Sequence, residues 1–172
     1  SVPIIAKLTP QVADVVKMDM FRDESFDFVL CEGDPLSYRS DPPKGITELV
    51  RVAKAGGVIV ASVDNLYSLV RYCLREGHMD RLTTLLESQW EKGGGGSLVS
   101  EFPVYYFRPE ELIQRFEEAG CGIEKIVGKN MFTGGLGDRL KDSETFETVQ
   151  RLELKYCDSP HLVGYAGHIA VV

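Results

Sequence analysis

The 172-residue sequence lacks several features that would point directly to a partner. No apolar run approaches the roughly 18 residues that a membrane-spanning helix requires, so no membrane partner is expected. No basic patch is visible and the formal net charge is −7, which argues against a nucleic-acid partner because phosphate binding needs clustered Lys and Arg. The hydrophobic content of 44% and charged content of 26% are typical of a globular cytoplasmic enzyme.

Metal-binding and disulfide motifs are missing as well. The three histidines are too dispersed for a recognisable metal-binding motif, so no metal is predicted: His78, His161 and His168. The four cysteines show no CxxC spacing and are expected to be reduced, as in the cytoplasm: Cys31, Cys73, Cys121 and Cys157. Because His168 falls in an alternating apolar run, we interpret it as a strand residue rather than a catalytic one.

Residues 26–64 are the most informative segment that is present. A short apolar run ends in Cys-Glu-Gly-Asp-Pro, an amphipathic stretch over 43–53 stops at a Gly-Gly pair, and a second apolar run over 58–63 ends in Asp-Asn. This order of strand, loop, helix and strand predicts a right-handed parallel crossover. Ligands of such sheets bind outside the carboxyl ends of the strands, so the loops after these two strands are the candidate site.

Periodicity predicts the remaining elements. Apolar residues at helical spacing favour helices over 65–76, 78–90, 108–120 and 143–156, and short apolar runs favour strands over 12–17, 123–127 and 163–172. The helix after Arg108 begins with a proline followed by two acids, which suits the first turn of a helix. The predicted fold class is therefore α/β.

The order of these pieces resembles the second half of a class I S-adenosylmethionine-dependent methyltransferase. The resemblance rests on Asp-Met at 19–20, Asp-Glu-Ser-Phe-Asp at 23–27, the Gly-Asp-Pro-Leu-Ser-Tyr loop at 33–38 and the stretch from Glu48 to Gly57. It continues at 106–113 and 117–120 and covers about two-thirds of the chain. It implies a Rossmann-like fold with a mostly parallel sheet and an antiparallel last strand. It also implies methyl transfer from S-adenosylmethionine to a small-molecule acceptor.

The glycine-rich turn of that family does not precede Asp19. Gly93–Ser97 reads as a flexible connector or an engineered linker, and the Gly135-Leu136-Gly137 cluster lacks the third glycine of the dinucleotide pattern. We therefore expect residues 1–172 to be a single, N-terminally incomplete domain that lacks the first two strands and has an open sheet edge. If Ser1 is the true first residue, no S-adenosylmethionine binding is expected, and a non-catalytic methyltransferase-like scaffold is the alternative. A nicotinamide-linked reductase is disfavoured because the glycine pattern and a Tyr-x-x-x-Lys pair are both missing.

The resemblance implies which residues bind the ligands. Asp19 and Met20 would hold the adenine of the cofactor, although Asp19 could instead cap a turn. Backbone groups of Cys31 and Glu32 would line the cofactor, and Gly33 would allow its close approach. The acceptor side would include Asp34 and Tyr38, which could equally be loop scaffolding. We interpret the neighbouring Asp64 as the N-cap of the following helix.

The long connection at 65–107 is the remaining candidate. It far exceeds the usual few-residue link between a strand and a helix, and it contains several aromatic residues, among them Tyr105 and Tyr106. We predict a helical cap that closes over the acceptor, with these two tyrosines as substrate-binding residues. The alternative is a helical hairpin that only packs on the domain.

Overall fold

The structure is a computed structural model that describes residues 9–93, 101–134 and 136–172. The strands and α-helices follow in the order β1 (Phe26–Cys31), α1 (Pro42–Val52), β2 (Ala53–Asp64), α2 (Leu66–Glu76), α3 (Met79–Ser88), β3 (Trp90–Gly93), β4 (Phe102–Tyr105), α4 (Pro109–Glu118), β5 (Ile126–Lys129), α5 (Ser143–Tyr156) and β6 (His168–Val171). Two short 3₁₀ helices, η2 (Gly137–Lys141) and η3 (Val163–Tyr165), flank α5.

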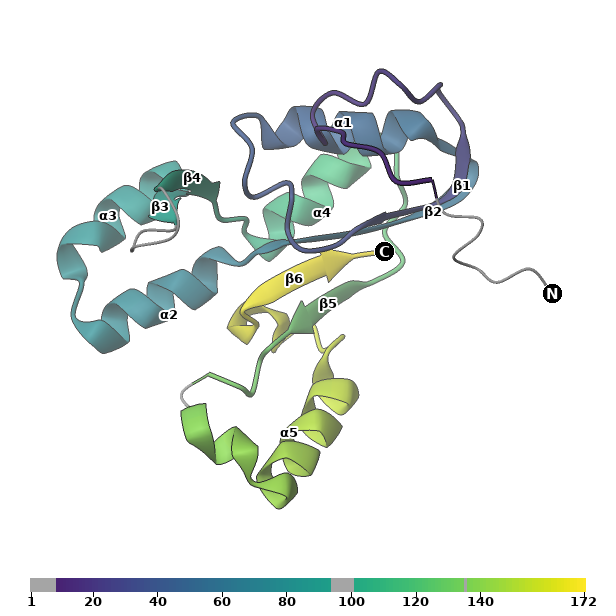
Figure 1. The fold of residues 1–172 in the computed structure, drawn as a ribbon. Coiled ribbons are helices and arrows are strands. Elements are labelled where there is room, and N and C mark those ends of the chain that lie inside the picture. Colours follow the sequence, from purple (N-terminus) through teal and green to yellow (C-terminus); the bar gives the residue numbers. More distant parts are fainter. Residues whose placement is uncertain (1–8, 94–100, 135) are drawn as a thin grey trace.

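Four strands form the central sheet in the order β1-β2-β6-β5. β1 and β2 are parallel, whereas β6 is antiparallel to both of its neighbours, so β5 runs in the same direction as β1 and β2. Figure 1 shows α1 and α4 together on one face of this sheet, with α5 on the β5 side, away from them. The α/β fold with one antiparallel strand is thus confirmed, including the antiparallel pairing of the last two strands.

The sequence explains why α1 forms where it does. The Asp41 side chain accepts a hydrogen bond from the Lys44 N–H over 3.1 Å, and Pro42 occupies the first turn, where its missing N–H has no cost. The apolar stripe of Ile46, Leu49 and Val52 is at most 3% exposed. Ile46 and Leu49 belong to the main core, which also contains buried residues of β2, α4 and β6. Burial of this face therefore fixes α1 against the sheet.

The predicted strand over 12–17 is wrong. The structure has instead a tight turn in which the Lys17 N–H donates to the Asp14 oxygen over 2.9 Å. A strand needs a paired neighbour, and no strand of the described residues lies beside this segment. Within the same residues, β1 pairs with β2 alone, and its Phe28 and Leu30 side chains are 55% and 59% exposed.

Strand bounds differ from the predictions in three other places. β2 begins at Ala53 rather than at residue 58, and β5 begins at Ile126 rather than at 123. The predicted strand over 163–172 is divided into η3 and β6. The 163–172 stretch is divided because the buried Asn65 amide donates hydrogen bonds to the backbone oxygens of Val163, Gly164 and Ala166, which holds these residues in a turn.

The 65–107 connection contains more than the two predicted helices. After α2 and α3, the strands β3 and β4 pair antiparallel, with Trp90 opposite Tyr105. The predicted helix over 78–90 ends at Ser88, because Gln89 adopts a left-handed backbone conformation with φ of 61°. Gly94 to Ser97 of the glycine-rich connector lie outside the described residues. No helix in the described ranges is both long enough and apolar enough to cross a membrane.

Candidate functional site

A cluster of two aspartates and one histidine lies at the carboxyl ends of β1 and β2. Asp34 follows β1, Asp64 ends β2, and His168 begins β6, where the antiparallel register places it opposite Asp64. Nδ1 of His168 lies 2.9 Å from Oδ2 of Asp34 and 3.4 Å from Oδ1 of Asp64. The Asp34, Asp64 and His168 side chains are 9%, 14% and 32% exposed. We call these three residues the rim cluster.

Two buried serines hold the aspartates of the rim cluster in place. The Asp34 N–H donates to Oγ of Ser62 over 3.3 Å, and the Asp64 N–H donates to Oγ of Ser37 over 2.9 Å. Both serines are completely buried. The carboxylates are thus carried by backbone that is fixed from both neighbouring strands.

The charges of the rim cluster are coupled. The close contact with Asp34 raises the pKa of His168 above its ordinary value, against the opposing effect of burial. Burial would raise the pKa of Asp34, but His168 and Ser62 outweigh burial and lower it. Burial and then the charge of Asp34 raise the pKa of Asp64. The cluster therefore favours an ionised Asp34 beside a protonated imidazole.

Aromatic side chains stand beside the rim cluster. The Tyr38 ring contacts Phe102 of β4 edge-on, with 5.7 Å between the ring centroids. The pKa values of both Tyr38 and Tyr106 are raised to about 12, first by burial and then by the negative charge of Asp64. Asp34 and Tyr38 therefore lie near Asp64, whereas Tyr106, although affected by the charge of Asp64, packs against the apolar cluster between α2 and α3.

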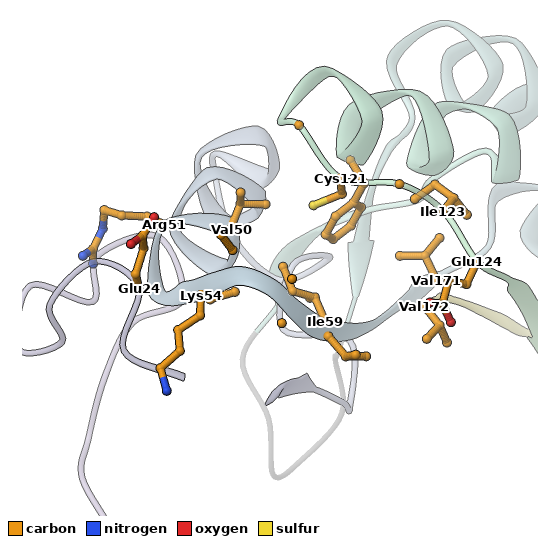
Figure 2. Close-up of a pocket in the computed structure, with 18 of the residues that line it drawn as sticks. Glu24, Val50, Arg51, Lys54, Ile59, Cys121, Ile123, Glu124, Val171 and Val172 are labelled. Atoms are coloured by element: carbon orange, nitrogen blue, oxygen red, sulfur yellow. The ribbon is translucent and has the colours of Figure 1, made fainter. Parts of the chain in front are cut away.

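A cavity of about 500 Å³ lies at the opposite end of the sheet, where β2 begins (Figure 2). Its lining includes Arg51, Lys54, Ile59 and Cys121. The two basic side chains are already paired with acids, Arg51 with Asp23 and Glu48 and Lys54 with Asp27. Neither is left to hold an anionic group of a ligand, so the carboxyl ends of the strands remain the stronger candidate site.

The predicted cofactor residues fall in two places. Cys31 is 5% exposed and burial raises its thiol pKa to about 11, while Glu32 pairs with Lys129 over 2.7 Å. Gly33 has φ of +84°, and a Cβ added there would meet nothing within 4 Å. All three therefore lie at the rim, and Gly33 leaves room for a ligand to approach the backbone.

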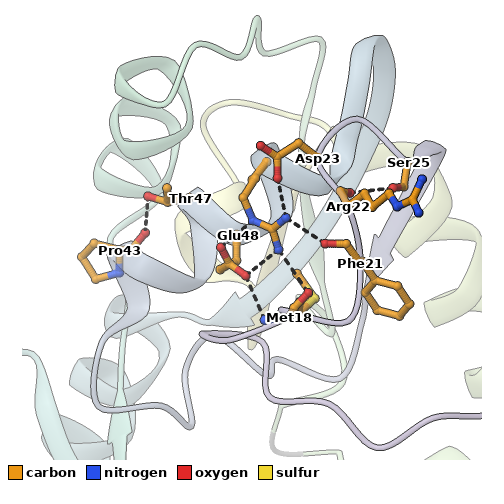
Figure 3. A network of polar contacts seen from close by, with 9 residues as sticks. Met18, Phe21, Arg22, Asp23, Ser25, Pro43, Thr47 and Glu48 are labelled. Carbon is orange, nitrogen blue, oxygen red and sulfur yellow. Dashed lines mark hydrogen bonds and ion pairs between the residues drawn. The ribbon is translucent and has the colours of Figure 1, made fainter.

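Asp19 and Met20 are elsewhere. Asp19 is 3.5 Å from Lys17 and its side chain is 74% exposed, and Met20 is 49% exposed. Their segment is attached to the end of α1, where Arg51 donates hydrogen bonds to the backbone oxygens of Met18 and Phe21 (Figure 3). No hydrogen bond or ion pair of the described residues joins Asp19 to the Cys31–Gly33 loop.

Tyr105 makes polar and aromatic contacts of its own that distinguish it from the adjacent Tyr106. Its hydroxyl donates to Oε1 of Glu111 over 2.6 Å and accepts from Nε2 of Gln89 over 2.8 Å. Its ring also packs edge-on against Phe107, with 4.8 Å between centroids. This tyrosine is therefore engaged between the cap and α4.

One residue of the rim cluster was wrongly predicted from the sequence, and the contacts of another were not foreseen. The predicted N-cap role of Asp64 is wrong, because Asn65 is the N-cap of α2 and its Oδ1 accepts from the Tyr67 N–H over 3.1 Å. His168 is indeed the first residue of a strand, but its side chain meets the two aspartates. The Asp-Asn sequence at the end of β2 could have indicated a carboxylate that is free for the site, because only one residue of the pair is needed to cap α2. For His168, only the strand register could have revealed the contact.

Comparisons with known proteins bear on the fold. A family model described as "Methyltransferase domain" matches residues 4–61. A methyltransferase structure from Methanosarcina mazei is 22% identical over 70% of this chain and 57% of its own, with a TM-score of 0.54. One from Clostridium acetobutylicum is 14% identical over 98% of this chain and 65% of its own, with a TM-score of 0.52. Both are described as S-adenosylmethionine-dependent, and the chain spans about 60% of their length.

Among curated proteins, none matches this sequence. The methyltransferase-domain model thus matches about the first third of the chain, and the chain as a whole has the Rossmann-like α/β fold of the solved S-adenosylmethionine-dependent methyltransferases to which it is similar.

Proposed function

We propose that the protein transfers the methyl group of S-adenosylmethionine to a small-molecule acceptor bound at the rim cluster. The observation that carries this proposal is the position of Asp34, Asp64 and His168 at the carboxyl ends of β1 and β2. Sheets of this kind bind their ligands at that edge. The family match supplies the reaction class, and the rim cluster supplies the polar groups that an acceptor requires.

The cofactor supplies an electrophilic methyl group on a sulfonium. The residues present fit such a ligand, because Gly33 leaves open space beside the backbone of Cys31 and Glu32. The peptide groups of this loop would contact the ligand, while the protonated thiol of Cys31 remains in the core. We therefore assign Cys31, Glu32 and Gly33 to cofactor binding.

The rim cluster would orient the acceptor. A carboxylate of Asp34 or Asp64 can accept a hydrogen bond from an O–H or N–H group, which fixes the direction of the lone pair that attacks the methyl group. Tyr38 and Tyr106 would form the wall of the acceptor site, since both lie close enough to Asp64 to be affected by its charge. Positioning and exclusion of water are the main contributions of the protein to such a displacement.

The 65–107 segment would act as the cap over this acceptor. The Tyr105 N–H donates to the Ser37 oxygen over 2.8 Å, so the cap is attached directly to the loop that follows β1. Acceptor identity would then depend on Tyr106, Tyr38 and Phe102 rather than on the sheet itself. We place the reaction in the cytoplasm, without nucleic-acid or membrane partners, because all four cysteines are free and the net charge is −7.

A screen of small metabolites with S-adenosylmethionine labelled in its methyl group tests this function. With the acceptor found in that screen, Asp34→Asn should lower kcat/KM by about 10- to 100-fold, because an oriented hydrogen bond to the acceptor is lost. Asp27→Asn is the control, since it removes a carboxylate paired with Lys54 near the beginning of β1, far from the rim cluster. Equal activity of wild type and Asp34→Asn would contradict the proposed acceptor site.

A further inference from the structure

We propose that Asp34, Asp64 and His168 form a binding site for a divalent cation of the first transition row. This inference goes beyond methyl transfer and does not depend on it. The sequence predicted no metal site because the histidines are dispersed, but the fold brings the ligands together from the ends of three strands.

The spacing of the ligand atoms fits a single ion. One atom from each side chain lies within 4.8 Å of the others. Ligands held about 2.1 Å from one ion are roughly 3.0–3.4 Å apart when they occupy neighbouring positions of an octahedron or a tetrahedron. The two distances from Nδ1 of His168 to the aspartate oxygens are 2.9 and 3.4 Å. Only small movements of the side chains are therefore needed to admit an ion.

Burial and missing hydrogen bonds distinguish this cluster from an ordinary acidic surface. The Asp34 side chain is only 9% exposed. Its Oδ1 and the Oδ2 of Asp64 are buried and make no hydrogen bond with the described part of the chain. Buried polar atoms without partners are costly, and coordination of an ion would satisfy them.

The charge of the cluster matches a divalent ion. Two carboxylates contribute two negative charges, and the imidazole would release its Nδ1 proton when the ion binds, so that it completes the ligand set without adding charge. The neighbouring ion pair of Lys129 and Glu32, 2.7 Å apart, adds no net charge. A divalent cation would therefore neutralise the site fully.

The supporting contacts are those of a rigid site. Ser62 and Ser37 fix the backbone of the two aspartates, and the strand register fixes His168 opposite Asp64. Such outer contacts orient metal ligands in proteins. The mixture of one imidazole and two carboxylates suits Mn²⁺, Fe²⁺, Co²⁺ or Zn²⁺ better than Ca²⁺ or Mg²⁺, which prefer oxygen ligands alone.

Titration of the metal-free protein with Co²⁺, followed by visible absorption, tests the site. We expect one equivalent to bind, and Asp34→Asn and His168→Gln each to weaken binding by at least about tenfold. Asp27→Asn, which removes a carboxylate paired with Lys54 near the beginning of β1, far from the cluster, should bind as wild type does. Circular dichroism of each variant verifies its fold. The absence of one-equivalent binding by wild type, or equal binding by folded His168→Gln, overturns the proposal.

A second measurement needs no variant. Mn²⁺ is paramagnetic and broadens the NMR resonances of nearby nuclei, so at substoichiometric Mn²⁺ the imidazole signals of His168 should disappear first. His78, the N-cap of α3, is the internal control. Preferential broadening of His78, or equal broadening of both histidines, contradicts a site at the rim cluster.

Discussion

The side-chain amide of Asn65 donates a hydrogen bond to the backbone oxygen of Ala166 over 2.7 Å. The same amide also contacts the oxygens of Val163 and Gly164, at 3.4 and 3.2 Å. Asn65 thus attaches the end of β2 to the turn that precedes β6. Asp64 directly precedes Asn65, and His168 is two residues after Ala166, so the geometry of the rim cluster depends on a side chain that is not part of it.

Asn65→Ala should lower the free energy of unfolding by about 2–4 kcal/mol, since it removes a helix cap and leaves buried carbonyl oxygens without a donor. Asp41→Ala is the matched control because it removes only the exposed N-cap of α1, and about 1 kcal/mol is expected. Urea unfolding of both variants measures the difference. Equal losses would show that the contacts of Asn65 across the sheet contribute nothing.

The adjacent tyrosines of the cap should behave differently. Tyr105→Phe removes a hydroxyl that binds Glu111 and Gln89, so it should destabilise the fold by about 1–3 kcal/mol with little change in the KM of the acceptor. Tyr106→Phe should raise that KM, because we propose this tyrosine as part of the wall of the acceptor site. Thermal unfolding and steady-state kinetics separate the two effects. The reverse pattern would mean that Tyr105 is the residue that contacts the acceptor.

Glu48 should make the stability sensitive to acid. Hydrogen bonds from Arg51, over 2.8 and 2.9 Å, hold the pKa of this carboxyl at about 2, below its ordinary 4.5 (Figure 3). A carboxyl with a lowered pKa in the native state stabilises it fully above the unfolded value. This contribution should be lost as the pH falls from about 4.5 towards 2.

The measurement is urea unfolding of wild type and Glu48→Gln across that pH range. Wild type should be the more stable protein at neutral pH, and the difference between the two should shrink as the pH approaches 2. A difference that stays constant with pH would show that the Glu48–Arg51 contact is not formed in solution.

Local patterns predicted most of the helices because caps and apolar stripes are properties of neighbouring residues. Asp41 with Pro42 begins α1, and the Leu112 and Phe116 stripe buries α4. The prediction of a strand over 12–17 was wrong because strand formation depends on residues that are distant in the sequence. A strand forms only against a partner, and its apolar residues were satisfied in other ways: Val15 packs against the core beside α1.

The site was predictable only in part for the same physical reason. Asp34 was found because it directly follows a strand, which is a local fact. His168 is more than a hundred residues away from Asp64 and Asp34 in the sequence, and it meets them only through the antiparallel register of β6. Asp64 and Asn65 are both good caps, and the choice between them was decided by the distant carbonyl oxygens that bind Asn65.

Binding of S-adenosylmethionine to the full-length protein, measured by calorimetry, tests the central claim most directly when wild type is compared with two glycine variants. Gly33 and Gly77 both have φ near +80°, and an added Cβ would meet nothing within 4 Å at either position. Ala at each should cost a similar amount of stability, about 1 kcal/mol. Gly33→Ala should also weaken S-adenosylmethionine binding by at least about tenfold, because the added alanine methyl group enters the space of the ligand. Gly77→Ala, at the end of α2, should bind S-adenosylmethionine as wild type does. No binding by wild type, or equal binding by the two variants, would contradict the account.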